Sequence, residues 1–171
     1  PLPNVQVLST GSHPHQISAG PDNQFVYVSL LGDDRMDYFR LNSEESITDV
    51  LQPILSPAVT LPSGSGPRHF VFSAQGNFLY VLHELSGYVQ VYARRATDGS
   101  LAFVEQHQLM DGVKPWAADI HLTPKGDFLY ASERATSRLY GYRINPKNGR
   151  LNPIGSWETE AQPRAFTISP D

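Results

Sequence analysis

Five residues with acid–base or anion-binding chemistry recur at matching places in a repeating sequence. His15, Arg68 and Arg164 each follow a proline that opens a short apolar segment, and Glu84 and Arg134 close the second apolar segment of their own repeats. Arginine binds carboxylate and phosphate oxygens through a planar fork of N–H donors. Glutamate and histidine are common general bases that activate water. These residue types together favour a site that binds an anion and moves a proton.

The repeat that carries these residues aligns without gaps. Its copies are PHQISAGPDNQFVYVSL from Pro14, PRHFVFSAQGNFLYVLH from Pro67, AADIHLTPKGDFLYASE from Ala117, and a shorter one, PRAFTISPD, from Pro163. Each full copy holds a Phe followed two places later by a Tyr, which puts both rings on one face of a strand. A repeat of about 50 residues made of short strands is typical of propeller blades.

Four strands are clearest in the copy that starts at Pro67. HFVFS and FLYVLHEL flank an AQGN turn, and YVQVYARR and LAFVEQHQL flank an ATDGS turn. Apolar residues recur at period 2 rather than 3.6, which argues against helices. We therefore predict an all-β fold, a β-propeller of four-stranded antiparallel blades with about three and a half blades in this chain. One partial propeller domain is expected over 1–171, with blade units at about 15–66, 67–116 and 117–162, partial blades at both ends and an irregular connection over 42–57.

Blade topology predicts where the charged residues meet. The first strand of an up-and-down sheet leaves one rim and the second returns to it, so the start of the first and the end of the second share that rim. The first strand is also the innermost. His15, Arg68, Arg164, Glu84 and Arg134 are therefore expected on one inner rim. Three further residues of the inner strands, expected to contact a ligand there, are His69, Asp119 and His121.

Each of these residues also has a purely structural interpretation. An arginine after a blade-opening proline can cap neighbouring carbonyl groups, and Glu84 and Arg134 can pair as a salt bridge between blades. His121 can be a core histidine. What favours function is the number of charged groups on one inner rim of a protein whose net charge is −4.

The composition excludes several classes of partner. A net charge of −4 and a pI near 5.8 argue against nucleic acid or an anionic membrane as a partner. The apolar runs are far shorter than the roughly 18 residues of a membrane span. The chain has no cysteine, no Gly-x-Ser-x-Gly elbow and no zincin histidine pair, so neither a thiolate metal site nor a serine hydrolase is supported. We expect no metal and no organic cofactor.

Three segments carry a resemblance to a known family. GPRHFVFSAQGNFLYVLHEL from Gly66, WAADIHLTPKGDFLYASERA from Trp116 and TEAQPRAFTISPD from Thr159 resemble the lactonase family of seven-bladed β-propellers. The likeness is greatest to bacterial 6-phosphogluconolactonases of the cycloisomerase-2 type, and fungal carboxymuconate cyclase is a more distant relative. By motif, the resemblance implies a catalytic set of His15, Arg68, Glu84 and Arg134. The sequence reads His-Pro-His at the first position, so His13 competes with His15.

The resemblance also implies an activity. It is hydrolysis of 6-phosphogluconolactone in the pentose phosphate route of the cytoplasm, with Arg68, Arg134 and Arg164 holding the phosphate and the developing oxyanion. Glu84 or His15 would be the general base. A muconate-type cycloisomerase that acts on a dicarboxylate and a non-catalytic interaction platform are the alternatives. Propellers close with more blades than this chain holds, so we expect a piece of a longer protein whose open strand edges make it self-associate.

Overall fold

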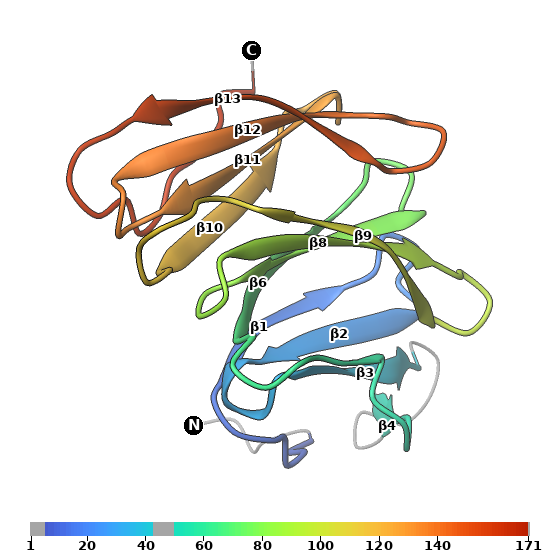
Figure 1. The fold of residues 1–171 in the computed structure, drawn as a ribbon. Coiled ribbons are helices and arrows are strands. Elements are labelled where there is room, and N and C mark those ends of the chain that lie inside the picture. The colour runs from blue at the N-terminus through green and yellow to red at the C-terminus, as the bar shows by residue number, and fades with distance from the viewer. Residues whose placement is uncertain (1–5, 43–49, 171) are drawn as a thin grey trace.

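The chain folds into three antiparallel sheets, which succeed one another along the sequence (Figure 1). The computed structural model describes residues 6–42 and 50–170. The first sheet contains β1 (Pro14–Ala19), β2 (Phe25–Leu30), β3 (Arg35–Leu41) and β4 (Leu51–Pro53), with β5 (Val59–Thr60) also pairing β3. The second contains β6 (Pro67–Phe72), β7 (Phe78–His83), β8 (Tyr88–Arg94) and β9 (Leu101–Gln108). The third contains β10 (Ala117–Leu122), β11 (Phe128–Glu133), β12 (Arg138–Ile144) and β13 (Leu151–Glu158).

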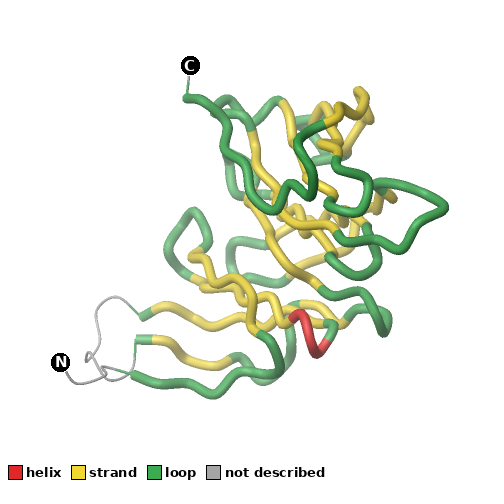
Figure 2. Tube along the Cα trace, turned by 90° about the vertical axis from the view of Figure 1, so that its left-hand side faces the viewer, coloured by secondary structure: helices red, strands yellow, loops and turns green. Residues whose placement is uncertain are grey.

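This architecture confirms the all-β, propeller-type fold. A single 3₁₀ turn, η1 (Leu31–Asp33), is the only helical element among the described residues (Figure 2). β4 lies inside the expected irregular connection, and residues 43–49 of that connection lie outside the described part of the chain.

The strand register places the start of the first strand and the end of the second strand of a blade on the same rim. Strand order follows the chain in each blade, and the inner strand β6 contacts both β1 and β10. Pro67 pairs with His83, and Ala117 pairs with Glu133. The start of each inner strand therefore lies beside the end of the second strand, as the topology predicts.

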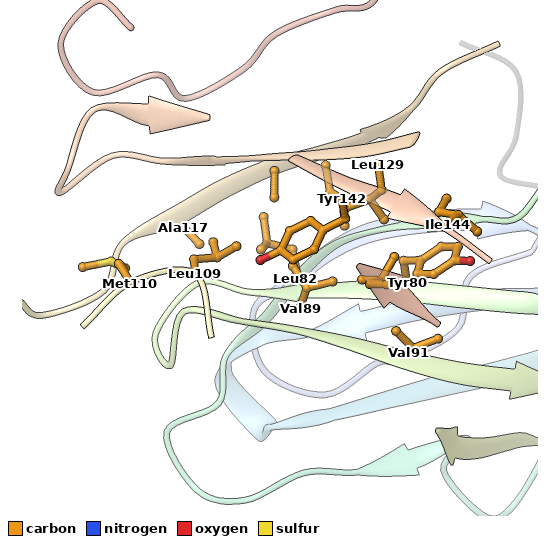
Figure 3. Packing of buried hydrophobic residues seen from close by; sticks show 13 residues of the cluster. Tyr80, Leu82, Val89, Val91, Leu109, Met110, Ala117, Leu129, Tyr142 and Ile144 are labelled. Carbon is orange, nitrogen blue, oxygen red and sulfur yellow. The ribbon is translucent and has the colours of Figure 1, made fainter. Parts of the chain in front are cut away.

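The core lies between the sheets, and β7 is buried on both faces because its side chains alternate. Leu79 and Val81 pack toward the first sheet, in one cluster with Phe25 and Tyr27. Tyr80 and Leu82 face the third sheet and join the larger cluster drawn in Figure 3. The run of apolar residues in β7 before His83 is thus the pattern expected of a strand that is covered on both faces.

A tyrosine at the same place in the first and second blades forms a hydrogen bond to the following blade. Tyr27 donates its hydroxyl to the carbonyl of Gly99 at 2.6 Å, and Tyr80 donates to the carbonyl of Gly149 at 3.1 Å. Gly99 lies in the β8–β9 turn with φ of 75°, and a Cβ there would come within 2.7 Å of the Phe25 ring. Only glycine combines that conformation with so close an approach. The Asp-Gly turn therefore serves the contact between blades as well as the hairpin.

The last segment of the chain lies in the place of a further inner strand without forming one. The backbone N–H of Phe166 donates to Asp119 Oδ2 at 3.2 Å, as the N–H of Phe70 donates to Gln16 Oε1 at 2.8 Å between the first and second blades. Residues 161–170 contain no strand. A ladder needs a second strand on the other side, and none is present in the described part of the chain.

Candidate functional site

Glu84 lies between two arginines on the inner rim. Its Oε2 is 2.7 Å from Nε of Arg68, and its Oε1 is 3.0 Å from Nη2 of Arg134. The indole Nε1 of Trp116 also donates to Oε1, at 3.2 Å. Arg68 belongs to β6, and Glu84 and Arg134 directly follow β7 and β11, so the cluster joins the second and third blades. The salt bridge between Glu84 and Arg134 is present, and Arg68 extends it.

Both arginines are buried and held by backbone carbonyls. Arg68 is 3% exposed and donates through Nη1 to the carbonyl of Ala118. Arg134 is 6% exposed and donates to the carbonyls of Trp116 at 3.0 Å and Ala117 at 3.1 Å. The arginines therefore do cap backbone carbonyl groups, and these contacts fix both guanidinium groups in place. Burial lowers the pKa of Arg68, and the charge of Arg134 lowers it further, against the opposing effect of Glu84.

Asp119 contacts two histidines of the inner strands, His69 and His121. Nδ1 of His69 is 2.7 Å from Asp119 Oδ1, and Nε2 of His121 is 3.0 Å from Oδ2. Burial alone would raise the pKa of Asp119, but hydrogen bonds from His69, the Phe166 N–H and His121 lower it to about 2. With a proton on Nδ1, His69 accepts at Nε2 from Nη1 of Arg68, 3.4 Å away. The carboxylate network and the arginine cluster are thus continuous.

His15 and Arg164 lie at the edge of this cluster. The His15 ring packs edge-on against His69, with ring centroids 5.0 Å apart. Loss of solvent around the ring lowers the pKa of His15 to about 4, with Arg68 and His69 adding to the effect. The ring is therefore neutral near pH 7. Arg164 is exposed, lowers the pKa values of both His15 and Arg68, and makes no ion pair with any residue in 6–42 or 50–170.

Seven of the eight residues selected from the sequence are linked by hydrogen bonds, ion pairs or ring contacts, and Arg164 acts on His15 and Arg68 only through its charge. The side chain of His13 contacts Ser12, with Nδ1 2.6 Å from the hydroxyl, whereas the ring of His15 packs against His69 of this linked set. Sequence reasoning missed Trp116 as a member of the site. Its place immediately before an inner strand, beside the rim, was the available signal.

The described residues show no other type of centre. No group of three or more His, Cys, Asp or Glu side chains in 6–42 or 50–170 is arranged to hold a metal ion. None of the helical segments described is long and apolar enough to cross a membrane. What the rim offers is fixed cations around one carboxylate, a neutral imidazole and an exposed arginine. Such a set can bind an anion and accept a proton.

Comparison with known proteins identifies consistent relatives. Residues 5–171 match the family model described as Lactonase, 7-bladed beta-propeller. The 6-phosphogluconolactonase of Serratia proteamaculans is 36% identical over 168 residues, which is 96% of this chain and 49% of that protein. The 6-phosphogluconolactonase of Yersinia pseudotuberculosis is 35% identical over 169 residues, again 96% and 49%. The solved structure of the Pseudomonas aeruginosa periplasmic gluconolactonase is 34% identical with a TM-score of 0.85, over 92% of this chain and 44% of that one. The chain thus spans about half the length of the curated relatives it matches.

Proposed function

This chain belongs to the lactonase family of seven-bladed β-propellers, and we propose that the full-length protein hydrolyses 6-phosphogluconolactone to 6-phosphogluconate. The observation that carries the proposal is a single carboxylate, Glu84, set between two buried arginines. Arg68 and Arg134 share this one carboxylate, and the exposed Arg164 adds a cation that pairs with no residue in the described part of the chain. That charge suits a substrate with a phosphate group and a carbonyl that becomes an oxyanion.

The arginines bind and stabilise charge in the proposed reaction. Water attacks the ring carbonyl carbon of the lactone, the bond to the ring oxygen breaks, and a carboxylate and a free hydroxyl result. Arg68 and Arg134 are fixed by backbone carbonyls, so they need no reorganisation when the oxyanion forms. Arg164 is exposed beside them and binds the phosphate. A single preorganised donor of this kind contributes about 100- to 1,000-fold in rate.

His15 is the general base that the contacts favour. Both oxygens of Glu84 are occupied, by Arg68 on one side and by Arg134 and Trp116 on the other, so this carboxylate orients donors rather than taking a proton. The His15 ring has an exposed side and a pKa of about 4, so it is in its neutral, accepting form near pH 7. His69, held by Asp119, supports one edge of the ring.

The test is a side-by-side assay of the full-length protein on 6-phosphogluconolactone, gluconolactone and a muconate-type dicarboxylate. We expect hydrolysis of the phosphorylated lactone well above its spontaneous rate. Activity on the dicarboxylate alone would establish the cycloisomerase alternative. No activity on any of the three, with the protein folded, would leave the non-catalytic platform.

A second candidate is hydrolysis of the unphosphorylated gluconolactone. The observation that favours it is the likeness to the periplasmic gluconolactonase of Pseudomonas aeruginosa, 34% identical with a TM-score of 0.85. The two candidates differ in compartment as well as in substrate, and we propose the cytoplasm for an enzyme of the phosphorylated lactone. If kcat/KM for gluconolactone exceeds that for the phosphorylated substrate, Arg164 is not a phosphate ligand and the second candidate holds.

We also propose that the free face of the third blade takes another blade. Tyr27 and Tyr80 each donate to a carbonyl of the following blade. Tyr130, the equivalent residue of β11, has no such acceptor in the described part of the chain. The 171-residue chain alone should therefore self-associate. Sedimentation velocity tests this, and a monodisperse monomer would contradict it.

A further inference from the structure

Trp116 contacts Glu84, Arg134 and Glu133 at the rim. Its indole Nε1 donates to Glu84 Oε1 at 3.2 Å, and its ring lies beneath the guanidinium of Arg134, with Cζ 4.0 Å from the ring centroid. Its carbonyl accepts from Nε of Arg134 at 3.0 Å, and its own N–H donates to Glu133 Oε1 at 2.7 Å. The residue therefore touches both groups of the Glu84–Arg134 pair.

The backbone of Trp116 is anchored from below. Glu133 is fully buried, and its second oxygen accepts from the N–H and the hydroxyl of Thr136, at 2.7 and 2.8 Å. This carboxylate fixes the loop before β10 to the loop after β11. The indole consequently projects from a rigid base, which is the condition for holding a second group accurately.

The indole is not part of the hydrophobic core. Trp116 is 40% exposed, although a tryptophan placed for packing is usually well buried. Trp116 lines a groove of about 430 Å³ on the rim, together with Leu85, Lys114, Pro115 and Ala135. The contacts that define its position are polar or cationic, and they all go to the proposed site or its support.

We propose that Trp116 is a positioning residue of this site, which sets the orientation of Glu84 and Arg134 toward the bound anion. The proposal rests on the proposed lactonase function and deepens it. The N–H of the indole holds one oxygen of Glu84, and the ring face holds the plane of Arg134 against the opposite side. A cation over an aromatic face within about 6 Å is attracted to it, and a charged hydrogen bond is stronger than a neutral one. Removal of the indole takes one donor from Glu84 and the aromatic face from Arg134, while the contacts of Arg134 to the backbone carbonyls of residues 116 and 117 remain. Both groups are then held less tightly, and the fold stays intact.

The experiment compares Trp116→Phe and Trp116→Leu in the full-length protein, with Trp157→Phe as the control. Phenylalanine keeps an aromatic face under Arg134 and loses the donor to Glu84, whereas leucine loses both. We expect kcat/KM on 6-phosphogluconolactone to fall about tenfold in the first variant and about 100-fold in the second. Trp157 is exposed on the outer strand β13, and its replacement should change neither kcat nor KM.

A double-mutant cycle separates positioning from a structural role. If Trp116 acts through Arg134, the losses caused by Trp116→Leu and Arg134→Lys should be clearly less than additive in kcat/KM. Melting temperatures of the Trp116 variants should stay within a few degrees of wild type. Additive losses, or Trp116→Leu kinetics equal to those of Trp157→Phe, would overturn the proposal.

Binding of 6-phosphogluconate, measured by calorimetry, distinguishes failure of this proposal from failure of the proposed function. If the wild type hydrolyses no lactone but binds the sugar acid, and Trp116→Phe weakens that binding about tenfold, the positioning role stands without the activity. If the wild type is active and both Trp116 variants bind and turn over like it, the positioning role is wrong and the activity stands.

Discussion

Two buried arginines, Arg94 and Arg68, connect neighbouring blades on opposite rims of the molecule. They differ in the carboxylate that neutralises each charge. On the rim away from the candidate site, Arg94 at the end of β8 contacts Asp22 in the β1–β2 turn, with Nη2 2.7 Å from each carboxylate oxygen. Its Nε donates to the hydroxyl of Tyr27 at 3.0 Å. On the site rim, Arg68 shares its carboxylate with a second arginine, Arg134.

The pKa values of the two arginines shift in opposite directions, because the two side chains differ in their charged neighbours. Burial opposes the charge of both. For Arg94, hydrogen bonds to Asp22 and Tyr27 outweigh burial and raise the pKa. For Arg68, burial together with Arg134 and Arg164 outweighs Glu84 and lowers it. A cation with a carboxylate of its own stabilises the contact between blades, whereas a cation that must share one is better stabilised by a further anion. This difference around Arg68 is our reason for proposing that an anion binds on the site rim rather than on the opposite one.

The largest contrast is expected when each carboxylate is neutralised. Glu84→Gln should lower kcat/KM on 6-phosphogluconolactone by about 100-fold or more, because Arg68 and Arg134, although still held by backbone carbonyls, lose the charged partner between them. It should also cost about 1–3 kcal/mol of stability, since two buried cations lose their shared partner. Asp22→Asn should lower the melting temperature and leave kcat/KM of the folded protein unchanged. Rates and thermal unfolding of both variants check this, and an activity loss of equal size in Asp22→Asn would abolish the distinction between the rims.

Lysine substitution of the two arginines sharpens the same contrast. Arg68→Lys keeps the charge but loses the fork that contacts Glu84, the Ala118 carbonyl and an anion together, so kcat/KM should fall about 10- to 100-fold. Arg94→Lys should lose stability and retain kcat/KM. Steady-state kinetics and chemical denaturation measure the two effects. Unchanged KM and kcat in Arg68→Lys would count against an anion site at this position.

The lowered pKa of Asp119 should make the free energy of unfolding depend on pH through this one carboxylate. Its pKa in the folded protein is about 2, below the usual value of 3.8. The stability it contributes is therefore present above about pH 4 and is lost as the pH falls toward 2. Between pH 5 and pH 2, the wild type should lose about 2 kcal/mol more than Asp119→Asn. Urea unfolding at both pH values tests this, and parallel losses in the two proteins would mean that the carboxylate is not held by His69 and His121.

The smallest expected effect concerns the tyrosine of the Arg94 cluster. Tyr27→Phe removes a hydroxyl that donates to Gly99 and accepts from Arg94, at a cost of about 1–2 kcal/mol. Tyr130→Phe alters the equivalent position of the third blade in this chain, where no such acceptor is described, and should cost close to nothing in the isolated chain. Equal destabilisation would show that the hydroxyl contact between blades has no net value.

The repeat predicts the fold and the location of the site because each has a local cause. Strand periodicity and the Asp-Gly turn define the blade, and antiparallel order brings Arg68 beside Glu84. Contacts between blades were harder to predict. That Trp116 donates to Glu84, or that Arg68 caps Ala118 of the next blade, depends on how two sheets pack. The regular spacing also did not show that residues 161–170 would form no strand, because a ladder depends on a neighbour elsewhere in the chain.

The most direct test of the central claim is a structure of the full-length protein with bound 6-phosphogluconate. The imbalance of charge predicts that an anionic group of the ligand lies within hydrogen-bond distance of Arg68 and Arg134, with Glu84 still between them and Arg164 turned toward the phosphate. A ligand held on the opposite rim beside Arg94, or a site rim left empty at saturating ligand, would contradict the account.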